Sequence, residues 1–73
     1  MVKVYVTSKG KRIAEEFKRW KTQPTYAKVL IWVSSHGAKG TEYEDMAELF
    51  DFDWATLDGI LKELEAEGYI KEV

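Results

Sequence analysis

Cysteine is absent from the 73 residues of this chain, which rules out disulfides and thiolate metal sites as sources of stability. The absence also fits a reducing compartment, so we expect a cytoplasmic protein. The short length leaves room for a single domain over residues 1–73. A chain of this size buries only about 60% of the surface that its unfolded state exposes, so it depends on close packing or on a partner chain.

Long apolar runs are absent as well. No stretch approaches the roughly 18 consecutive apolar residues of a membrane-spanning helix, and the N-terminus lacks the layout of a signal peptide. His36 is the only histidine, and the aspartates around residue 51 miss the Gly and Glu offsets of a calcium loop. Neither a nucleophile with its base nor a phosphate-binding glycine loop is present. The sequence therefore predicts no catalytic residue, no metal site, no cofactor and no enzyme.

Charge is present in quantity and is divided unevenly along the chain. Residues 1–28 carry eight basic and two acidic side chains, which gives +6, whereas residues 29–73 carry three basic and eleven acidic side chains, which gives −8. Such a division is typical of a nucleic-acid surface on the basic half, or of two halves that attract each other within or between chains. Three Trp, four Tyr and three Phe supply a compact core or a core plus an aromatic dimer interface.

Hydrophobic periodicity predicts a mainly α fold with a small antiparallel β-hairpin or ribbon, in the order β-α-α-α-α-β. Val2, Val4 and Val6 alternate with polar residues, which predicts a strand. The apolar run over residues 29–33 predicts a buried central helix. The expected strands cover residues 2–7 and 69–73, and the expected helices cover residues 11–21, 24–36, 41–50 and 54–67.

Capping residues define the ends of the last two predicted helices. Thr41 and Glu44 form a capping box at the start of the third helix, whose inner face we expect to hold Met46, Ala47, Leu49 and Phe50. A turn of about three residues follows, with Phe52 as its apolar centre. Asp53 is expected to cap the fourth helix, and Gly68 to end it in the left-handed conformation.

Two helices joined by a short turn, preceded by a buried helix and followed by Gly and a strand, match a helix-turn-helix unit with a wing strand. Residues 45–53 resemble the first helix and turn of winged-helix regulators, with Ala47 at the tight helix crossing and Phe52 in the turn. Residues 55–70 resemble the recognition helix and the following strand of the multiple-antibiotic-resistance and phenolic-acid repressor families. The resemblance covers about residues 24–73 and implies a winged helix-turn-helix fold.

Residues 5–14 are similar to the segment that follows the wing in those repressors, where a strand ends in Thr-x-x-Gly and leads into the closing helix. In this chain, Thr7 and Gly10 take those two positions, but the segment comes first in the sequence. The similarity therefore predicts a winged helix in permuted order. It places the strand over residues 2–7 antiparallel to the strand over residues 69–73.

In the families that the chain resembles, the recognition helix enters the major groove of DNA, and the wing and neighbouring helix ends hold phosphates. Carried over by position, the resemblance implies that Thr41 holds a phosphate and that Lys3 or Lys71 flanks the DNA backbone. The positions that would face bases are Ala55, Thr56, Asp58, Gly59 and Lys62. Lys9, Lys11 and Arg12 belong to a basic N-terminal segment that either adds phosphate contacts or forms a solvated face.

Two functions follow as expectations. The first is a DNA-binding transcriptional regulator. The alternative is a protein-interaction module in a transcription or replication assembly, favoured by Asp58-Gly59, because those families commonly have Ser followed by Arg or Lys there. Trp54 is expected either to contact a partner or to pack on its own helix. The stripe of Ile13, Phe17 and Trp20 predicts a homodimer interface or a core role.

Overall fold

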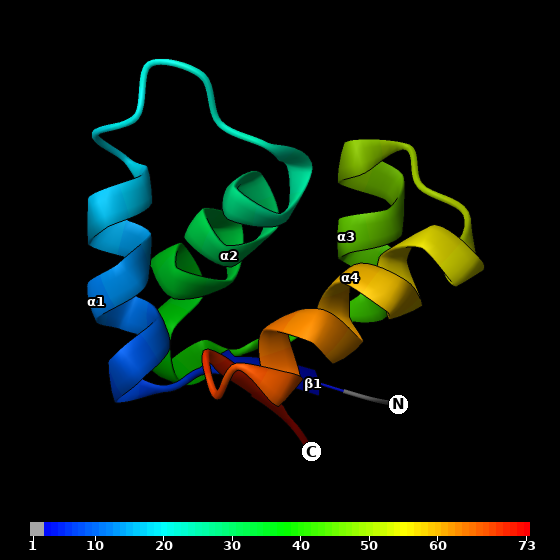
Figure 1. Cartoon of the computed structure of the whole chain (residues 1–73). Coiled ribbons are helices and arrows are strands. Elements are labelled where there is room, and N and C mark those ends of the chain that lie inside the picture. The colour runs from blue at the N-terminus through cyan, green and yellow to red at the C-terminus, as the bar shows by residue number, and fades with distance from the viewer. Residues whose placement is uncertain (1–2) are drawn as a thin grey trace.

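The computed structural model describes residues 3–73 as four α-helices and a small antiparallel sheet (Figure 1). The elements are β1 (Lys3–Val6), α1 (Ser8–Phe17), α2 (Thr25–His36), the 3-10 turn η1 (Gly37–Lys39), β2 (Thr41–Glu42), α3 (Tyr43–Phe50), α4 (Trp54–Ala66) and β3 (Ile70–Glu72). The predicted mainly helical fold and its order β-α-α-α-α-β are confirmed, with η1 and the two-residue β2 as additions. Val2, which the sequence places in the first strand, lies outside the described residues.

The sheet has the order β2-β1-β3, so β1 is its central strand. β1 pairs antiparallel with β3, with Val4 opposite Glu72 and Val6 opposite Ile70. Beyond β3, the backbones of Lys3 and Val73 exchange hydrogen bonds of 3.0 and 2.9 Å, so the two ends of the described chain lie side by side (Figure 1). The antiparallel pairing predicted for the first and last strands is confirmed.

Helix α2 supplies the centre of the core. Its Ala27, Val29, Leu30 and Val33 are fully buried, and they lie in one apolar cluster with residues from α1, α3, α4 and the sheet. The apolar run is not buried throughout, because Ile31 and Trp32 are only half-buried. The prediction for the third helix is wrong at Leu49, which is 53% exposed rather than turned inward. Among residues 3–73, no helix is both long enough and apolar enough to cross a membrane.

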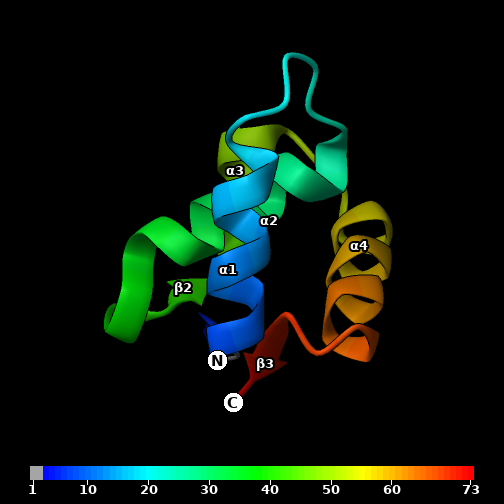
Figure 2. The same ribbon diagram turned by 60° about the vertical axis from the view of Figure 1, so that its left-hand side comes forward.

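Helix α1 begins earlier than the sequence pattern indicates. Thr7 is its N-cap: the Thr7 hydroxyl accepts a 3.0 Å hydrogen bond from the Gly10 backbone N–H and donates one of 2.6 Å to the Gly68 carbonyl. The helix therefore starts at Ser8 instead of Lys11, because a threonine cap outweighs the break expected from Ser8 and Gly10. The helix ends at Phe17, so Trp20 lies in the segment between α1 and α2, which protrudes from the molecule (Figure 2).

The structure contradicts the predicted capping box at Thr41. Thr41 lies in β2, where it pairs with Val4 of β1, and Thr41 is only 3% exposed. Helix α3 starts two residues later, and its N-cap, Glu42, makes no side-chain capping bond. The edge of β1 offers backbone partners at this point, and a β-branched residue such as Thr suits a strand.

Candidate functional site

Helices α3 and α4 form a compact unit joined by the turn at residues 51–53. Asp51 adopts the left-handed conformation with a φ of 56°, and the Phe52 N–H donates to the Ala47 carbonyl at 3.0 Å. The predicted cap of α4 is confirmed, because the Asp53 carboxylate accepts a 2.7 Å hydrogen bond from the Thr56 backbone N–H. That hydrogen bond also lowers the pKa of the Asp53 carboxyl. The predicted left-handed Gly68 after α4 is confirmed as well, with a φ of 81°.

Helical spacing brings most of the predicted α4 site residues onto one face. Positions four and eight residues apart lie on the same side of a helix, so Trp54, Asp58 and Lys62 are neighbours. Ala55, Thr56 and Gly59 are exposed beside them. Thr41 does not join this face, since its buried hydroxyl is out of reach of a phosphate. Lys3 and Lys71 are exposed on the sheet.

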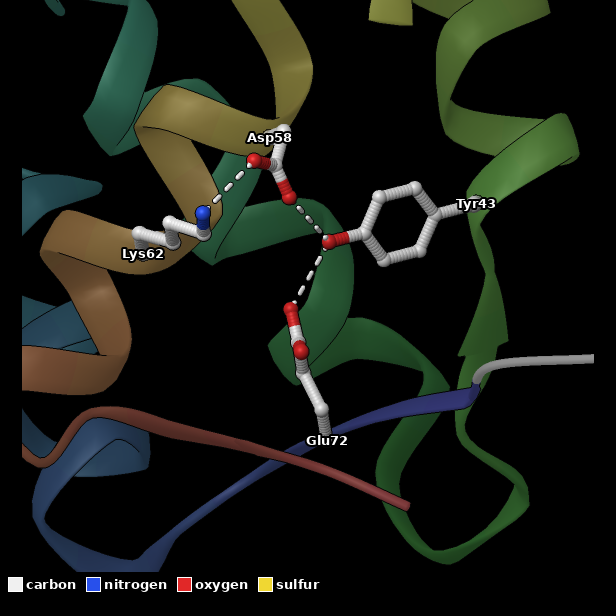
Figure 3. Close-up of polar contacts among 4 residues, drawn as sticks. All are labelled: Tyr43, Asp58, Lys62 and Glu72. Carbon is white, nitrogen blue, oxygen red and sulfur yellow. Dashed lines mark hydrogen bonds and ion pairs between the residues drawn. The ribbon is translucent and has the colours of Figure 1, made fainter. Parts of the chain in front are cut away.

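A polar cluster ties this face of α4 to α3 and β3 (Figure 3). The Tyr43 hydroxyl lies 2.8 Å from Glu72 Oε1 and 3.2 Å from Asp58 Oδ1, so its single hydrogen is shared between two carboxylates. The other carboxylate oxygen of Asp58 lies 3.1 Å from Lys62 Nζ. Burial, and then the hydrogen bonds and negative charges of Glu72 and Asp58, raise the pKa of Tyr43 far above its usual value.

This cluster changes the interpretation of two predicted base-reading residues. Asp58 and Lys62 form an ion pair with each other, so part of the positive charge of Lys62 is neutralised by its own helix. Asp58 also accepts from Tyr43, which gives the aspartate a role in holding α4 to α3. No sequence pattern signals the cluster, because its hydrogen bonds join residues 15 and 29 positions apart.

Trp54 is the most exposed aromatic side chain of the α3–α4 unit. It is 56% exposed, and its ring stacks on that of Tyr43 with the centroids 5.8 Å apart and the planes 14° apart. Tyr43 is in turn held by the two carboxylates, so the stacked pair is fixed in orientation. We call the surface formed by Trp54, Tyr43, Asp51, Asp53 and Asp58 the Trp54 face.

The surroundings of the Trp54 face are acidic. Between residues 41 and 61 the chain has no Lys or Arg and seven acidic residues: Glu42, Glu44, Asp45, Glu48, Asp51, Asp53 and Asp58. The exposed Lys9, Lys11 and Arg12 lie on α1, which Figure 1 shows across α2 from the α3–α4 unit. The fold thus keeps the predicted basic segment apart from Trp54.

The predicted dimer stripe divides into a core part and a surface part. Phe17 is 7% exposed and belongs to the core, and Ile13 is half-buried against that core. Trp20 is 44% exposed and packs on Phe17 at a centroid distance of 4.7 Å.

Within residues 3–73, no three His, Cys, Asp or Glu side chains lie where they would hold a metal ion together. Comparison with protein-family models, with curated proteins and with solved structures gives no match for the chain.

Replacing Tyr43 by Phe tests the polar cluster. We expect Tyr43→Phe to lower the free energy of unfolding by about 1 kcal/mol at pH 7, because hydrogen bonds to charged groups contribute about 1.5–3 kcal/mol and partial exposure reduces that. Chemical denaturation measures the change. Tyr5→Phe is the matched control, since the Tyr5 hydroxyl makes no hydrogen bond to other residues in the part of the chain that the structure describes.

The same variant has a predicted dependence on pH. The folded state raises the pKa of Tyr43 above 10.0, so the contribution of Tyr43 is complete below pH 10 and is lost as the pH rises further. The difference in stability between wild type and Tyr43→Phe should therefore shrink above pH 10. Equal stability of the two proteins at pH 7 would contradict the role given to the cluster.

Proposed function

We propose that the chain is a cytoplasmic winged helix-turn-helix domain that acts as a protein-interaction module and binds a Lys- and Arg-rich segment through the Trp54 face. The winged-helix assignment is supported by the order of the elements: α2 is followed by α3, a short turn and α4, and then by β3. The pairing of β3 with β1, which carries the Thr7-x-x-Gly10 motif at its end, supports the permuted order.

The exposed Trp54 is the observation that carries the proposed function. An indole ring that is 56% exposed and held flat against Tyr43 offers a rigid apolar surface at little cost in entropy. Tryptophan is enriched among the residues that dominate protein interfaces. A partner that contacts this ring buries a large apolar area, and the Trp54 side chain does not have to become ordered on binding.

Charge decides the chemistry of the partner. Asp51 and Asp53 are exposed and next to Trp54 in the sequence, and no basic residue occurs between residues 41 and 61. Lys62, the one lysine on this side of α4, is paired with Asp58, so Asp51 and Asp53 set the charge close to Trp54. A guanidinium or ammonium group placed over the indole ring gains cation–π attraction as well as attraction to the carboxylates. A basic protein segment therefore fits this face, and the resemblance to winged-helix regulators suggests a transcription or replication assembly as its setting.

Sequence-specific DNA binding is the second candidate. The exposed Ala55, Thr56 and Gly59 on α4 favour it, because small side chains on a helix of this kind allow close approach to base edges. Exposed lysines on the sheet add two positive charges, at Lys3 and Lys71. Against it, DNA affinity depends on neutralising phosphates, and the helix-turn-helix unit presents carboxylates instead.

One titration separates the two candidates. A fluorescently labelled oligo-arginine peptide and a labelled DNA duplex are each mixed with the protein over a series of salt concentrations. We expect the peptide to bind and the duplex to bind more weakly at every salt concentration. Trp54→Ala should raise the Kd of the peptide roughly thirtyfold, as expected when an interface side chain contributing about 2 kcal/mol is removed. Trp20→Ala, which changes an exposed Trp on another surface, is the matched control.

The charge component is tested with the double variant Asp51→Asn and Asp53→Asn. Asn tolerates the left-handed conformation of residue 51 and is a good N-cap at residue 53, so the variant removes two charges and keeps the turn. The salt dependence of peptide binding should become shallower. Unchanged affinity in Trp54→Ala would contradict the proposal, and steeply salt-dependent duplex binding that Lys62→Glu weakens would establish the DNA-binding candidate instead.

A further inference from the structure

A second apolar surface lies away from the Trp54 face. An open groove of about 540 Å³ runs between the end of α1, the start of α2 and the end of α4. Its apolar lining consists of Phe17, Tyr26, Leu64, Ala66 and Tyr69. The proposed function makes no use of this groove.

Two large aromatic side chains adjoin the groove: Tyr26 lines it, and Trp20 packs on Phe17, which also lines it. Trp20 is 44% exposed and Tyr26 is 39% exposed, and both rings pack on Phe17, at centroid distances of 4.7 and 5.7 Å. Trp20 belongs to the segment between α1 and α2 that protrudes beyond the helices (Figure 2). A tryptophan on a protruding segment is placed to enter a cavity on another molecule, and the groove beside it is itself such a cavity.

The groove and the segment that carries Trp20 have opposite charge. On the α4 side, Glu63 and Glu67 are exposed and line the groove. Next to Trp20 in the sequence are three exposed basic residues: Lys18, Arg19 and Lys21. Lys18 is already paired with Glu15 at 3.3 Å, which leaves Arg19 and Lys21 as the groups that face an acidic partner. Each copy of the chain thus presents an apolar groove with an acidic side on α4, and a basic segment around Trp20 that adjoins the groove through Phe17.

We infer that the groove is a homodimer interface in which Trp20 of each copy enters the groove of the other. A two-fold axis that runs along the groove sets the basic side of one copy against the acidic side of its partner. The same rotation sets the acidic side of the first copy against the basic side of the partner, so both charge contacts form at once. A second copy of the chain supplies both the apolar and the charged complement of the surface.

The charge contacts of this homodimer predict that two variants with opposite charge changes lose dimerisation alone and regain it when they are mixed. In the variant Arg19→Glu and Lys21→Glu, both sides of the groove are acidic, and in the variant Glu63→Lys and Glu67→Lys, both are basic. Each variant alone should lose at least about tenfold in dimer affinity through like-charge contacts. When the two variants are mixed, each side meets its opposite charge again. The mixture should therefore form a heterodimer.

The test is analytical ultracentrifugation of the full chain over a range of concentrations. Wild type should shift from monomer to dimer as concentration rises, Trp20→Ala should remain a monomer, and Trp54→Ala should dimerise like wild type. Circular dichroism checks that each variant is folded. A wild type that is monomeric at every concentration would overturn the inference, as would a dimer that Trp20→Ala leaves intact or a mixture of the charge variants that stays monomeric. Because Trp54 is left unchanged in all the other variants, failure here is distinguishable from failure of the proposed peptide binding.

Discussion

Gly10→Ala is expected to lower the free energy of unfolding by about 3 kcal/mol, although alanine is the better helix former. Gly10 lies in the first turn of α1, where an added Cβ atom would clash with the backbone carbonyl of Tyr69. The obstacle is backbone, so no side-chain rotation relieves it. Helix α1 has to move away from the start of β3, which breaks the hydrogen bonds of Thr7 to Gly68 and Tyr69.

The size of this effect is large for a small domain. A chain of 73 residues has a free energy of unfolding of about 4–11 kcal/mol. A loss of about 3 kcal/mol corresponds to a decrease of roughly 12–24 °C in Tm. Thermal and chemical denaturation followed by circular dichroism measure both quantities.

Gly59→Ala is the matched control for this prediction. Gly59 is also within a helix, but it is exposed, and a Cβ atom there meets nothing within 4 Å. The helix propensity of alanine should therefore act unopposed and raise the free energy of unfolding by about 0.8–1 kcal/mol. If both glycine variants were stabilised, the close approach of α1 to β3 would be wrong.

The Thr7-x-x-Gly10 motif shows how much of the fold the sequence alone predicts. The motif, together with the alternating valines, correctly predicted that the first strand pairs with the last. What it did not reveal is the reason for the two residues. Thr7 caps α1 and bonds to the end of α4, and Gly10 allows the helix to approach β3. The cap is local, but the hydrogen bond of Thr7 to Gly68 and the approach of Gly10 to Tyr69 depend on residues about 60 positions away, which periodicity does not register.

Short-range signals failed where a long-range contact competed with them. Thr41 and Glu44 satisfy the capping-box pattern, yet the edge of β1 captures Thr41 as a strand residue. Leu49 has helical spacing with Met46, but Leu49 is 53% exposed, whereas Met46 is fully buried. Local patterns therefore predict the existence and the end of α3 correctly, but they place its start two residues too early.

The candidate site was predicted in part. The resemblance to winged-helix repressors assigned Asp58 and Lys62 to the exposed face of the fourth helix, and the structure places the two side chains together there as an ion pair. Tyr43 was missed, because its hydroxyl reaches carboxylates on two other elements and its ring reaches Trp54. An aromatic residue in the first turn of a helix has no local pattern that distinguishes such a role from ordinary packing.

Val4→Asp is expected to unfold the domain, or nearly so, because β1 is the strand that joins the whole sheet. β2 and β3 each pair with β1 and lie on opposite sides of it. Val4 is fully buried and stands opposite both Thr41 and Glu72. A carboxylate at this position would be buried without a cation and would lie beside the Glu72 carboxylate. Burial of an unpaired charge costs more than about 4 kcal/mol, which is comparable to the expected stability of the whole domain.

Lys71→Asp provides the comparison for Val4→Asp, because it introduces the same side chain into the same sheet at an exposed position opposite Tyr5. Its cost should stay within about 1 kcal/mol, the range of strand propensities. Circular dichroism and tryptophan fluorescence at 25 °C should show a folded Lys71→Asp and a largely unfolded Val4→Asp. If the two variants unfolded at the same denaturant concentration, β1 would not be the strand that holds β2, β3 and the helices above them in one domain. The arrangement of the α3–α4 unit against β3 depends on this strand, so Val4→Asp should also abolish peptide binding at the Trp54 face.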